Sequence, residues 1–393
     1  MSIPCRWIRS RDIARGLLDS VRPKALLVPG GWAKLKSESL GQEGRREIRR
    51  YVSQGGAYIG FCGGAGLALK EQGNLPGLGL CSWKRRTFPD CLPNFSGHIH
   101  ATVRPDDRFL KSAPESDQLL PVWWPPQIAP DGTDEQVSIV AAYTRPGPDF
   151  WVADLELGSL SPEQIGEWEN LYGIRLSPAL LQNEACIISG RFGQGRYLLS
   201  YSHLETPQSP QSNQLLSRLL TECCDMTSPQ ETQVPLFDPV HGATHWDNPE
   251  ILRAARLIDE IFRTGEKNFL LFWREPWLLG WRRGIPGPAL NTLILYIHAL
   301  RCTDPAESTV QLWEEKSRRF MPLLERFQAE MLDYLRAERF VLSTSPSSPE
   351  ASSSARLQLK REHLVGKFPG YGGMYAELVH VLDDLFWTII ASR

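Results

Sequence analysis

The chain has 393 residues, of which 42% are hydrophobic, and a formal net charge of −2 at pH 7, so it is long enough to bury one or two large apolar cores. Basic clusters such as GRREIRR are balanced by nearby acids, which argues against a nucleic-acid partner. No apolar run approaches the ~18–20 residues of a membrane-spanning helix, and the amino terminus lacks the apolar stretch of a signal peptide. We therefore predict a cytoplasmic protein with no membrane partner.

Short β-type runs alternate with helical or looped stretches between Lys24 and Leu204. Alternation of this kind is typical of an α/β domain, which we place at residues 1–226. We expect its sheet to be largely parallel, with antiparallel strands in the middle. The runs are ALLVPGG (25–31), AYIGFCGG (57–64), HIHATVRP (98–105), VSIVAAYT (137–144) and ACIISGRFGQGRYLLSYSH (185–203).

The remainder of the chain has a helical pattern. Residues 227–247 form a polar, proline-containing linker, and residues 248–393 predict an α-helical domain that begins with Asn248 as a helix cap and Pro249 in the first turn. Pro322 is expected to kink or split a long helix. A low-complexity segment near 343–356 predicts a disordered loop.

Three tryptophans in this second part follow a helical spacing. Trp273, Trp277 and Trp281 recur at every fourth position, which predicts one apolar face of a helix. We expect this face to pack on the first domain or to bind a partner protein.

The stretch YIGFCGGAGLAL (58–69) places Cys62 on a glycine-rich turn directly after an apolar run. A nucleophile flanked by glycines between a strand and a helix is the arrangement of a nucleophile elbow, which exposes the reactive atom. A helix that follows such a turn also favours the thiolate, because its first N–H groups carry partial positive charge. A buried structural cysteine fits this stretch equally well.

Two further segments support a reactive thiol. Pro29-Gly30-Gly31 ends the preceding strand, where the N–H of Gly31 can form half of an oxyanion hole with that of Gly63. Far downstream, His203 and Glu205 are two residues apart at the end of another strand, so their side chains project to the same side. Glu205 could thus orient the imidazole while His203 faces the thiol.

The segments VPGGWA, GFCGG and SHLE resemble the class I glutamine-amidotransferase-like superfamily and, within it, the biotin-protein ligase N-terminal domain family, over residues 1–207. The resemblance implies a flavodoxin-like three-layer sandwich. It also implies that Cys62 is the nucleophile, His203 the general base and acid, and Glu205 the residue that orients His203. Gly31 and Gly63 would be the oxyanion donors.

The chain also departs from these relatives. The turn continues GGAGLALK, without the residues that hold glutamine, and no GRGRxGR loop of a biotin ligase follows. The family fold opens with one more strand and helix than this chain contains, so we expect the natural start to lie upstream or the unit to have been lost. An intact mass of the natively expressed protein that matches 393 residues would rule out the upstream start.

Other histidines and tryptophans suggest two further kinds of site, a metal site and a pocket wall. His98 and His100 share a strand face and could be combined with His241 and His245 as metal ligands, but no cysteine or carboxylate is spaced to complete the site. We therefore expect no metal and no cofactor. Trp32, Trp123 and Trp124 are candidates for a wall of the substrate pocket, and core packing is the alternative for the pair at 123–124.

The sequence thus predicts a cysteine-dependent hydrolase or amidotransferase-like enzyme that acts on an amide or related acyl bond of a small molecule or peptide, and not a biotin ligase. The alternative is a non-catalytic regulatory or interaction module with the same fold, which binds a metabolite or a partner protein. A redox-sensing thiol at Cys62 is a third option.

Overall fold

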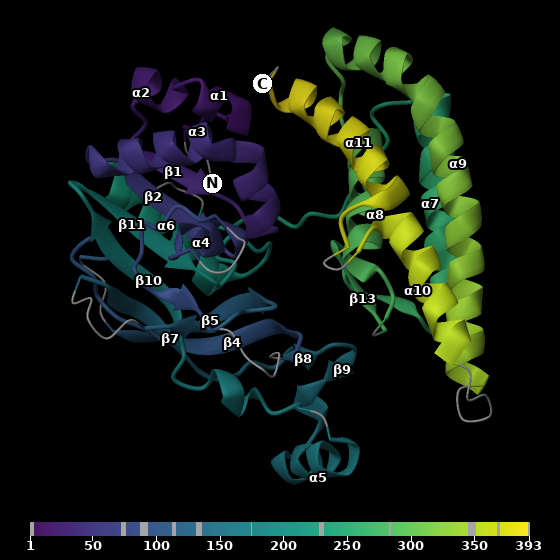
Figure 1. The fold of residues 1–393 in the computed structure, drawn as a ribbon, viewed down its shortest axis with the longest axis horizontal. Helices are drawn as coiled ribbons and strands as arrows, with labels where there is room; N and C mark the ends of the chain where they lie inside the picture. The colour runs from purple at the N-terminus through teal and green to yellow at the C-terminus, as the bar shows by residue number, and fades with distance from the viewer. Residues whose placement is uncertain are drawn as a thin grey trace. The chain divides into compact units, whose positions relative to one another are not determined.

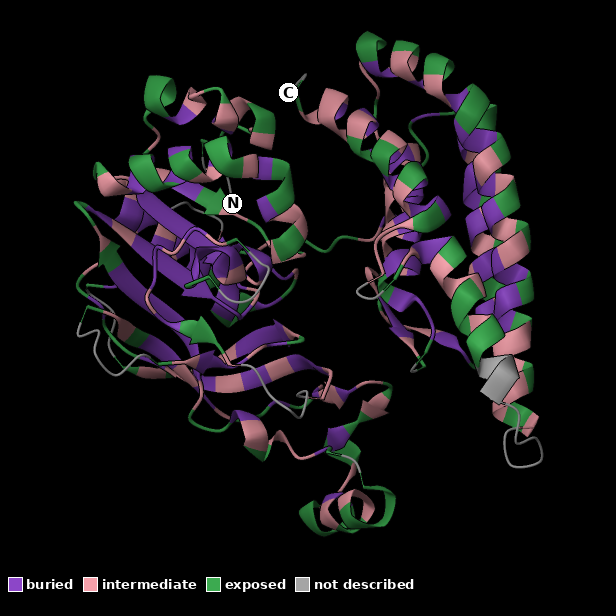
Figure 2. Cartoon of the chain, viewed as in Figure 1, coloured by how far each residue is buried: buried purple, intermediate pink, exposed green. Residues whose placement is uncertain are grey.

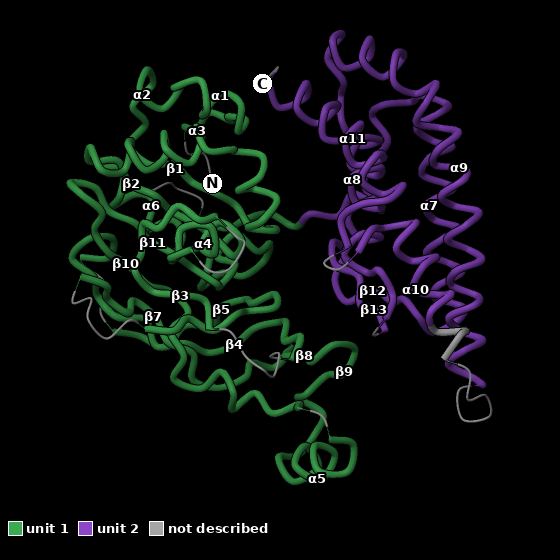
Figure 3. Tube along the Cα trace, in the orientation of Figure 1, with its two compact units in different colours: residues 1–236 green, residues 237–393 purple. Residues whose placement is uncertain are grey.

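The computed structural model describes residues 4–71, 76–86, 93–111, 115–130, 136–173, 175–227, 232–282, 284–344, 351–367 and 370–391. The chain divides into two compact units, Met1–Leu236 and Phe237–Arg393 (Figure 3). The border between them lies within the polar segment 227–247. Each unit has an apolar core of its own.

The first unit is a mixed α/β structure, as the alternating pattern predicts (Figure 1). Its helices are α1 (Ser10–Ala14), α2 (Leu17–Val21), α3 (Ala33–Ser53), α4 (Gly63–Ala68), α5 (Pro162–Tyr172) and α6 (Pro210–Cys224), with 3-10 turns at Leu157–Ser159 and Pro178–Leu181. Its strands are β1 (Ala25–Val28), β2 (Ala57–Phe61), β3 (Lys84–Arg85), β4 (Phe95–Val103), β5 (Ser116–Trp123), β6 (Ile128–Ala129), β7 (Ser138–Pro146), β8 (Trp151–Val152), β9 (Leu155–Glu156), β10 (Ala185–Phe192) and β11 (Gly195–Ser200).

Nine of these strands form one sheet in the order β1-β2-β11-β10-β7-β4-β8-β9, with β5 paired to β4. Only β1, β2 and β11 are parallel neighbours, and the other pairings are antiparallel. The prediction of a largely parallel sheet was therefore wrong. For the pair β10 and β11 the reason is local: the strands are joined by a two-residue turn, and a connection that short permits only antiparallel pairing. The other antiparallel pairs depend on which strands become neighbours in the fold.

The sheet buries both of its faces around β2 (Figure 2). Side chains alternate along a strand, so Ala57, Ile59 and Phe61 join a core with α6, whereas Tyr58 joins a core with α1 to α4. Every residue of β2 is buried. The end of this strand, which directly precedes Cys62, is consequently held between two packed layers.

The second unit is mainly helical and contains α7 (Pro249–Lys267), α8 (Gly287–Arg301), α9 (Glu307–Thr344), α10 (Ala351–Val365) and α11 (Gly373–Ala391). Asn248 caps α7 as predicted, because its side chain accepts hydrogen bonds from the backbone N–H groups of Glu250 and Ile251. Pro322 lies inside α9 and does not split it, and Figure 1 shows that this helix bends along its course.

Two local expectations in this unit need correction. The tryptophan-rich segment is a hairpin of β12 (Leu271–Glu275) and β13 (Leu278–Trp281), because Pro276 interrupts any helix at the turn. The loop expected near 343–356 is shorter, since α9 extends to Thr344 and α10 begins at Ala351. Residues 345–350 lie outside the described part of the chain.

Candidate functional site

Cys62 lies on the turn between β2 and α4, with φ +47° and ψ −108°. A positive φ is unusual for a residue with a side chain and places strain at this position. The turn is held because the backbone N–H of Cys62 donates to the carbonyl of Ser200 at the end of β11, at 2.8 Å. The thiol is partly exposed, so the sharp strand-to-helix turn predicted around it is present and presents the sulfur to the surface.

The flanking glycines are required by close backbone contacts. A Cβ on Gly60 would lie 2.7 Å from the carbonyl carbon of Gly64, and one on Gly64 would collide with the carbonyl oxygen of Val28. A Cβ on Gly63 would collide with the carbonyl oxygen of Gly31. The turn around Cys62 and the loop after β1 are thus packed backbone to backbone, which only glycine permits.

This packing places the N–H groups of Gly31 and Gly63 at the thiol, where both lower its pKa. Gly31 has φ +106°, a conformation that favours glycine. Two backbone donors from separate loops therefore converge on one sulfur atom. Such a pair of fixed N–H groups can also stabilise an oxyanion that develops beside the sulfur.

His203 follows β11 and approaches the thiol from the side of Gly30. A Cβ on Gly30 would lie 2.9 Å from Cε1 of His203 and 3.3 Å from Cβ of Cys62, so both side chains contact this glycine. The His203 N–H donates to the carbonyl of Pro121 in β5 at 2.8 Å, which fixes the backbone. Because Gly30 has no side chain, the imidazole of His203 and the thiol of Cys62 can approach each other.

The carboxylate of Glu205 lies beside the imidazole of His203. Its Oε1 lies 2.8 Å from Nδ1 of His203. The other ring nitrogen, Nε2, is buried and makes no aligned hydrogen bond to any described residue, but it is within interacting range of the Cys62 sulfur. Nε2 is therefore the ring nitrogen that faces the thiol.

The segment that carries Glu205 is fastened to α6. Asn213 is fully buried there and donates from Nδ2 to the carbonyls of Leu204 at 2.8 Å and Thr206 at 2.9 Å, on either side of Glu205. Its Oδ1 accepts from the N–H of Val234 at 2.9 Å. One amide side chain thus holds the backbone from which Glu205 projects.

The electrostatics favour a thiolate beside an imidazolium. Burial alone would raise the pKa of Cys62, but the nearby imidazole of His203, with its charge, and the N–H groups of Gly31 and Gly63 outweigh it, so the pKa lies below the usual cysteine value. Burial alone would lower the pKa of His203, but Cys62 and Glu205 together raise it well above the usual histidine value. By contrast, burial raises the pKa of Cys186 to about 12, as expected for a structural thiol.

Two of the three tryptophans proposed for a pocket wall meet. The rings of Trp32 and Trp124 have centroids 6.4 Å apart and are tilted by 58°. Trp32 directly follows Gly31 and precedes α3, and Trp124 directly follows β5, the strand that also contacts His203 through Pro121. Trp123 is the last residue of β5 and pairs with Ser96 in the ladder.

The four histidines considered as metal ligands belong to two different units of the chain. Among the described residues, no group of three or more histidine, cysteine or acidic side chains is arranged to hold a metal ion. Each of the four histidines instead lies beside a carboxylate, in the pairs His98–Asp149, His100–Asp117, His241–Asp238 and His245–Asp304. His98 also contacts the hydroxyl of Ser209 at 2.7 Å.

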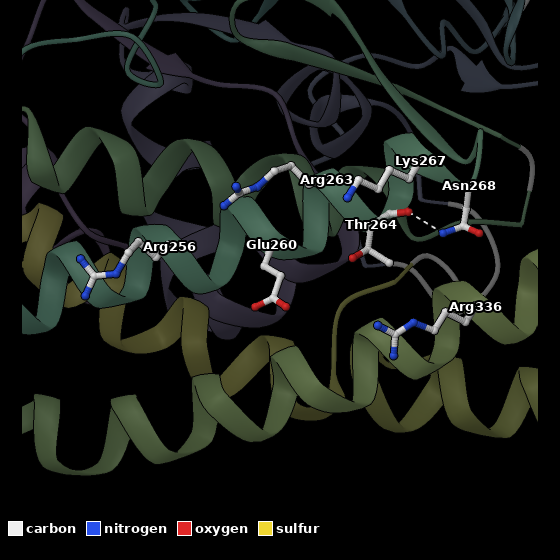
Figure 4. Close-up of a pocket in the computed structure, with 7 residues that line it drawn as sticks. All are labelled: Arg256, Glu260, Arg263, Thr264, Lys267, Asn268 and Arg336. Atoms are coloured by element: carbon white, nitrogen blue, oxygen red, sulfur yellow. Dashed lines mark hydrogen bonds between the residues drawn. The ribbon is translucent and has the colours of Figure 1, made fainter.

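A separate hollow of about 560 Å³ lies in the second unit between α7 and α9 (Figure 4). Most of its charged side chains are cationic, and Cys62 is not among its residues. The carboxylate of Glu260 within it accepts a hydrogen bond from Gln328 at 2.7 Å. The lining residues are Arg256, Glu260, Arg263, Thr264, Lys267, Asn268 and Arg336.

Sequence reasoning missed two residues that border the site. Asn213 gives no signal in the sequence, because its partners are known only once the chain is folded. Lys36 does give one: it lies in the first turn of α3, where a cation opposes the helix dipole. Its Nζ lies 3.7 Å from the position that a Cβ on Gly31 would occupy.

Comparisons with known proteins give a family match and remote structural likenesses, two of which are described here. A β-galactosidase from Bacillus circulans sp. alkalophilus is 14% identical with a TM-score of 0.26, over 52% of this chain and 22% of that one. A cytoplasmic protein from Salmonella typhimurium is 11% identical with a TM-score of 0.29, over 57% of this chain and 76% of that one. The chain therefore spans less than a quarter of the β-galactosidase, and no curated protein matches it.

The family match covers the segment that builds the thiol turn. Residues 21–71, from the end of α2 through β1, α3, β2 and α4, match the model described as "Biotin-protein ligase, N terminal". The match includes Gly31, Cys62 and Gly63, and it ends before His203 and Glu205. Over residues 21–71 the chain is thus similar to the biotin-protein ligase N-terminal domain family.

Proposed function

We propose that the protein is a cysteine-dependent hydrolase or amidotransferase-like enzyme that acts on an amide or related acyl bond. Cys62 is the nucleophile, His203 transfers protons and Glu205 orients His203. The observation that carries the proposal is that Cys62 and His203 both lie against Gly30, with Oε1 of Glu205 2.8 Å from Nδ1 of the imidazole. A nucleophile, a base and an orienting acid in this order are the parts of nucleophilic acyl transfer.

The reaction proceeds in two stages on these residues. The Cys62 thiolate attacks the acyl carbon, a C–S bond forms, and the N–H groups of Gly31 and Gly63 stabilise the oxyanion. His203 gives its Nε2 proton to the departing amine as the C–N bond breaks, which leaves a thioester. His203 then accepts a proton from a water that attacks the thioester, and the acid and the thiolate are released.

We further propose that the chain does not attach biotin. The family match is confined to residues 21–71, and the sequence lacks the glycine- and arginine-rich adenylate loop of a biotin ligase. The substrate we propose is a small molecule or peptide amide, bound beside Trp32 and Trp124. A cytoplasmic location stays a prediction, and no described helix is long and apolar enough to cross a membrane.

A non-catalytic module is the second candidate. The observation that favours it is the helical second unit, which has its own core and a cation-lined hollow. In this role the second unit binds a partner protein or a metabolite, and Cys62 catalyses no reaction. The enzyme and the non-catalytic module differ in one measurable property: only in the enzyme does Cys62 form and release an acyl group.

The test is acylation by p-nitrophenyl acetate, an activated acyl ester. We expect a burst of p-nitrophenolate, an acetyl group on Cys62 in the mass spectrum, and slow release of acetate. Cys62→Ser should abolish the burst and His203→Ala should slow it by about 10²-fold or more. Cys5 is exposed and serves as a reference thiol within the same molecule. Acetylation of Cys5 without Cys62 would exclude the enzyme and leave the module.

A further inference from the structure

Lys36 brings a positive charge to the candidate oxyanion hole. Its Nζ lies 3.7 Å and its Cε 3.9 Å from the position that a Cβ on Gly31 would occupy. The neighbouring Gly30 contacts His203 and Cys62 instead. The lysine and the histidine therefore approach two successive residues of the same loop.

This ammonium group has no carboxylate partner among the described residues. Lys34, two residues before Lys36, is exposed. Its Nζ lies 3.9 Å from Oε1 of Glu38, in an ion pair typical of a helix surface. Lys36 is half-buried, and burial lowers its pKa, an effect that its interaction with the Cys62 charge opposes in part. A cation that is desolvated without a fixed counter-ion costs stability unless another group pairs with it.

Helix stability does not explain the position. Lys36 belongs to the first turn of α3, where the exposed N–H groups favour negative rather than positive side chains. The thiolate does not need the lysine as its main partner, because His203 and two backbone N–H groups already serve it. The ammonium group lies instead beside Gly31, one of the two donors of the candidate oxyanion hole.

We propose that Lys36 binds an anionic group of the substrate, so the enzyme acts on acyl compounds that carry a carboxylate close to the bond that is cleaved. This inference rests on the proposed function, because it assigns the substrate class of the same site. A carbonyl oxygen held by Gly31 and Gly63 places the adjacent substituents of the acyl group beside the ammonium of Lys36. A carboxylate there supplies the missing counter-ion, and an uncharged acyl group leaves it unpaired.

Two alkylating reagents that differ only in charge test the proposal. Iodoacetate and iodoacetamide both transfer a carbon to the thiolate, with formation of a C–S bond and loss of iodide, but only iodoacetate is an anion. The ratio of their rates at Cys62 is measured at one pH in the full chain and in Lys36→Met. Lys34→Met, an exposed lysine of the same turn, is the matched control, and Lys36→Arg keeps the charge.

We expect Lys36→Met to lower the ratio of the iodoacetate rate to the iodoacetamide rate by about fivefold or more, because the anionic reagent loses one partly solvated ion pair. The rate with iodoacetamide should change little. Lys34→Met should leave the ratio unchanged and Lys36→Arg should largely preserve it. Added salt should reduce the ratio in the parent.

Three results would overturn the proposal. An unchanged ratio in a folded Lys36→Met protein shows that the lysine does not attract anions. An equal fall for both reagents shows that Lys36 acts on the thiolate and not on the substrate. No reaction of Cys62 with either reagent, while Cys5 reacts, overturns the proposed function itself and this inference with it.

Discussion

Cys62 occupies a strained backbone conformation that costs roughly 1–3 kcal/mol and persists only because its surroundings impose it. The surroundings are backbone atoms: Gly63 lies against the carbonyl of Gly31, and Gly64 against that of Val28. Replacement of either glycine would therefore push the turn apart. The reactive position of the thiol is a property of these contacts and not of the cysteine alone.

Gly30 provides the sharpest test of this packing. Gly30→Ala places a methyl group 2.9 Å from Cε1 of His203 and 3.3 Å from Cβ of Cys62, so the imidazole must move away from the thiol. We expect acylation of Cys62 to fall by about tenfold or more, because misplacement of a catalytic group by about 1 Å is costly. Thermal unfolding should change little.

Gly166→Ala is the control for Gly30→Ala, since a Cβ at position 166 in α5 meets no atom within 4 Å. This control should keep full acylation. If Gly30→Ala acylates at the parent rate, His203 does not work against Cys62 in the arrangement described.

Glu205 should act through the charge of His203. Glu205→Gln removes a carboxylate that raises the pKa of the imidazole, so that pKa falls and the thiolate loses its cationic partner at a lower pH than before. We expect acylation at neutral pH to slow by about tenfold or more. The pH dependence of the p-nitrophenyl acetate burst measures this, with the exposed Glu163→Gln on α5 as control. Equal profiles in the two variants would contradict an orienting role.

Some of these residues could be read from the sequence and others could not. Cys62, His203 and Glu205 stand out because glycines surround a thiol and because a two-residue spacing at a strand end places two side chains together. The 2.8 Å approach of His203 to Glu205 agrees with that spacing. Lys36 and Gly30 are defined by contacts across loops, which a local pattern does not contain.

Among the elements, α6 supports the site without touching the thiol. Its Asn213 holds the carbonyls of Leu204 and Thr206, so the backbone on both sides of Glu205 is fixed by one buried side chain. Loss of buried hydrogen bonds of this kind costs about 1–3 kcal/mol for each group left unpaired.

Asn213→Ala leaves the carbonyls of Leu204 and Thr206 and the N–H of Val234 unpaired, so we expect it to lower the free energy of unfolding by about 3 kcal/mol or more and also to slow acylation of Cys62. Chemical denaturation and the burst assay measure the two effects. Gln214→Ala, an exposed neighbour on the same helix, should change neither. A stable Asn213→Ala protein with the parent burst rate would show that the clamp on Glu205 has no part in the chemistry.

The hairpin of β12 and β13 shows where spacing misleads. Trp273 and Trp281 stand eight residues apart, which fits both a helix face and two opposed strands. Pro276 at the turn decides between them, because it cannot continue a helix. Trp273 instead packs on Phe262 of α7, with ring centroids 5.2 Å apart. Asn248, by contrast, was identified from its own side chain, since a helix cap is a local interaction.

For the whole molecule, the cores of the two units draw on separate parts of the chain. The core of the second unit is built from residues 246–389, and the two cores of the first unit from residues 13–223. The α/β character of the first unit was predictable from alternation. The direction of its strands was not, because it depends on which strands become neighbours.

We expect residues 1–236 to fold alone and to retain the reactivity of Cys62, because the elements around the thiol all belong to this unit. The measurement is the burst with p-nitrophenyl acetate for the truncated and full chains, with thermal unfolding as the folding control. A folded fragment that loses the burst would show that the second unit contributes to the site.

The pH dependence of Cys62 alkylation by iodoacetamide tests the central claim most directly. Mass spectrometry follows Cys62 and the exposed Cys5 in the same sample, in the parent and in His203→Ala. Because His203 lowers the pKa of Cys62, Cys62 in the parent should react at lower pH than Cys5, and the profile of the variant should move to higher pH. Profiles that coincide in the two proteins and follow that of Cys5 would contradict a thiol activated by His203.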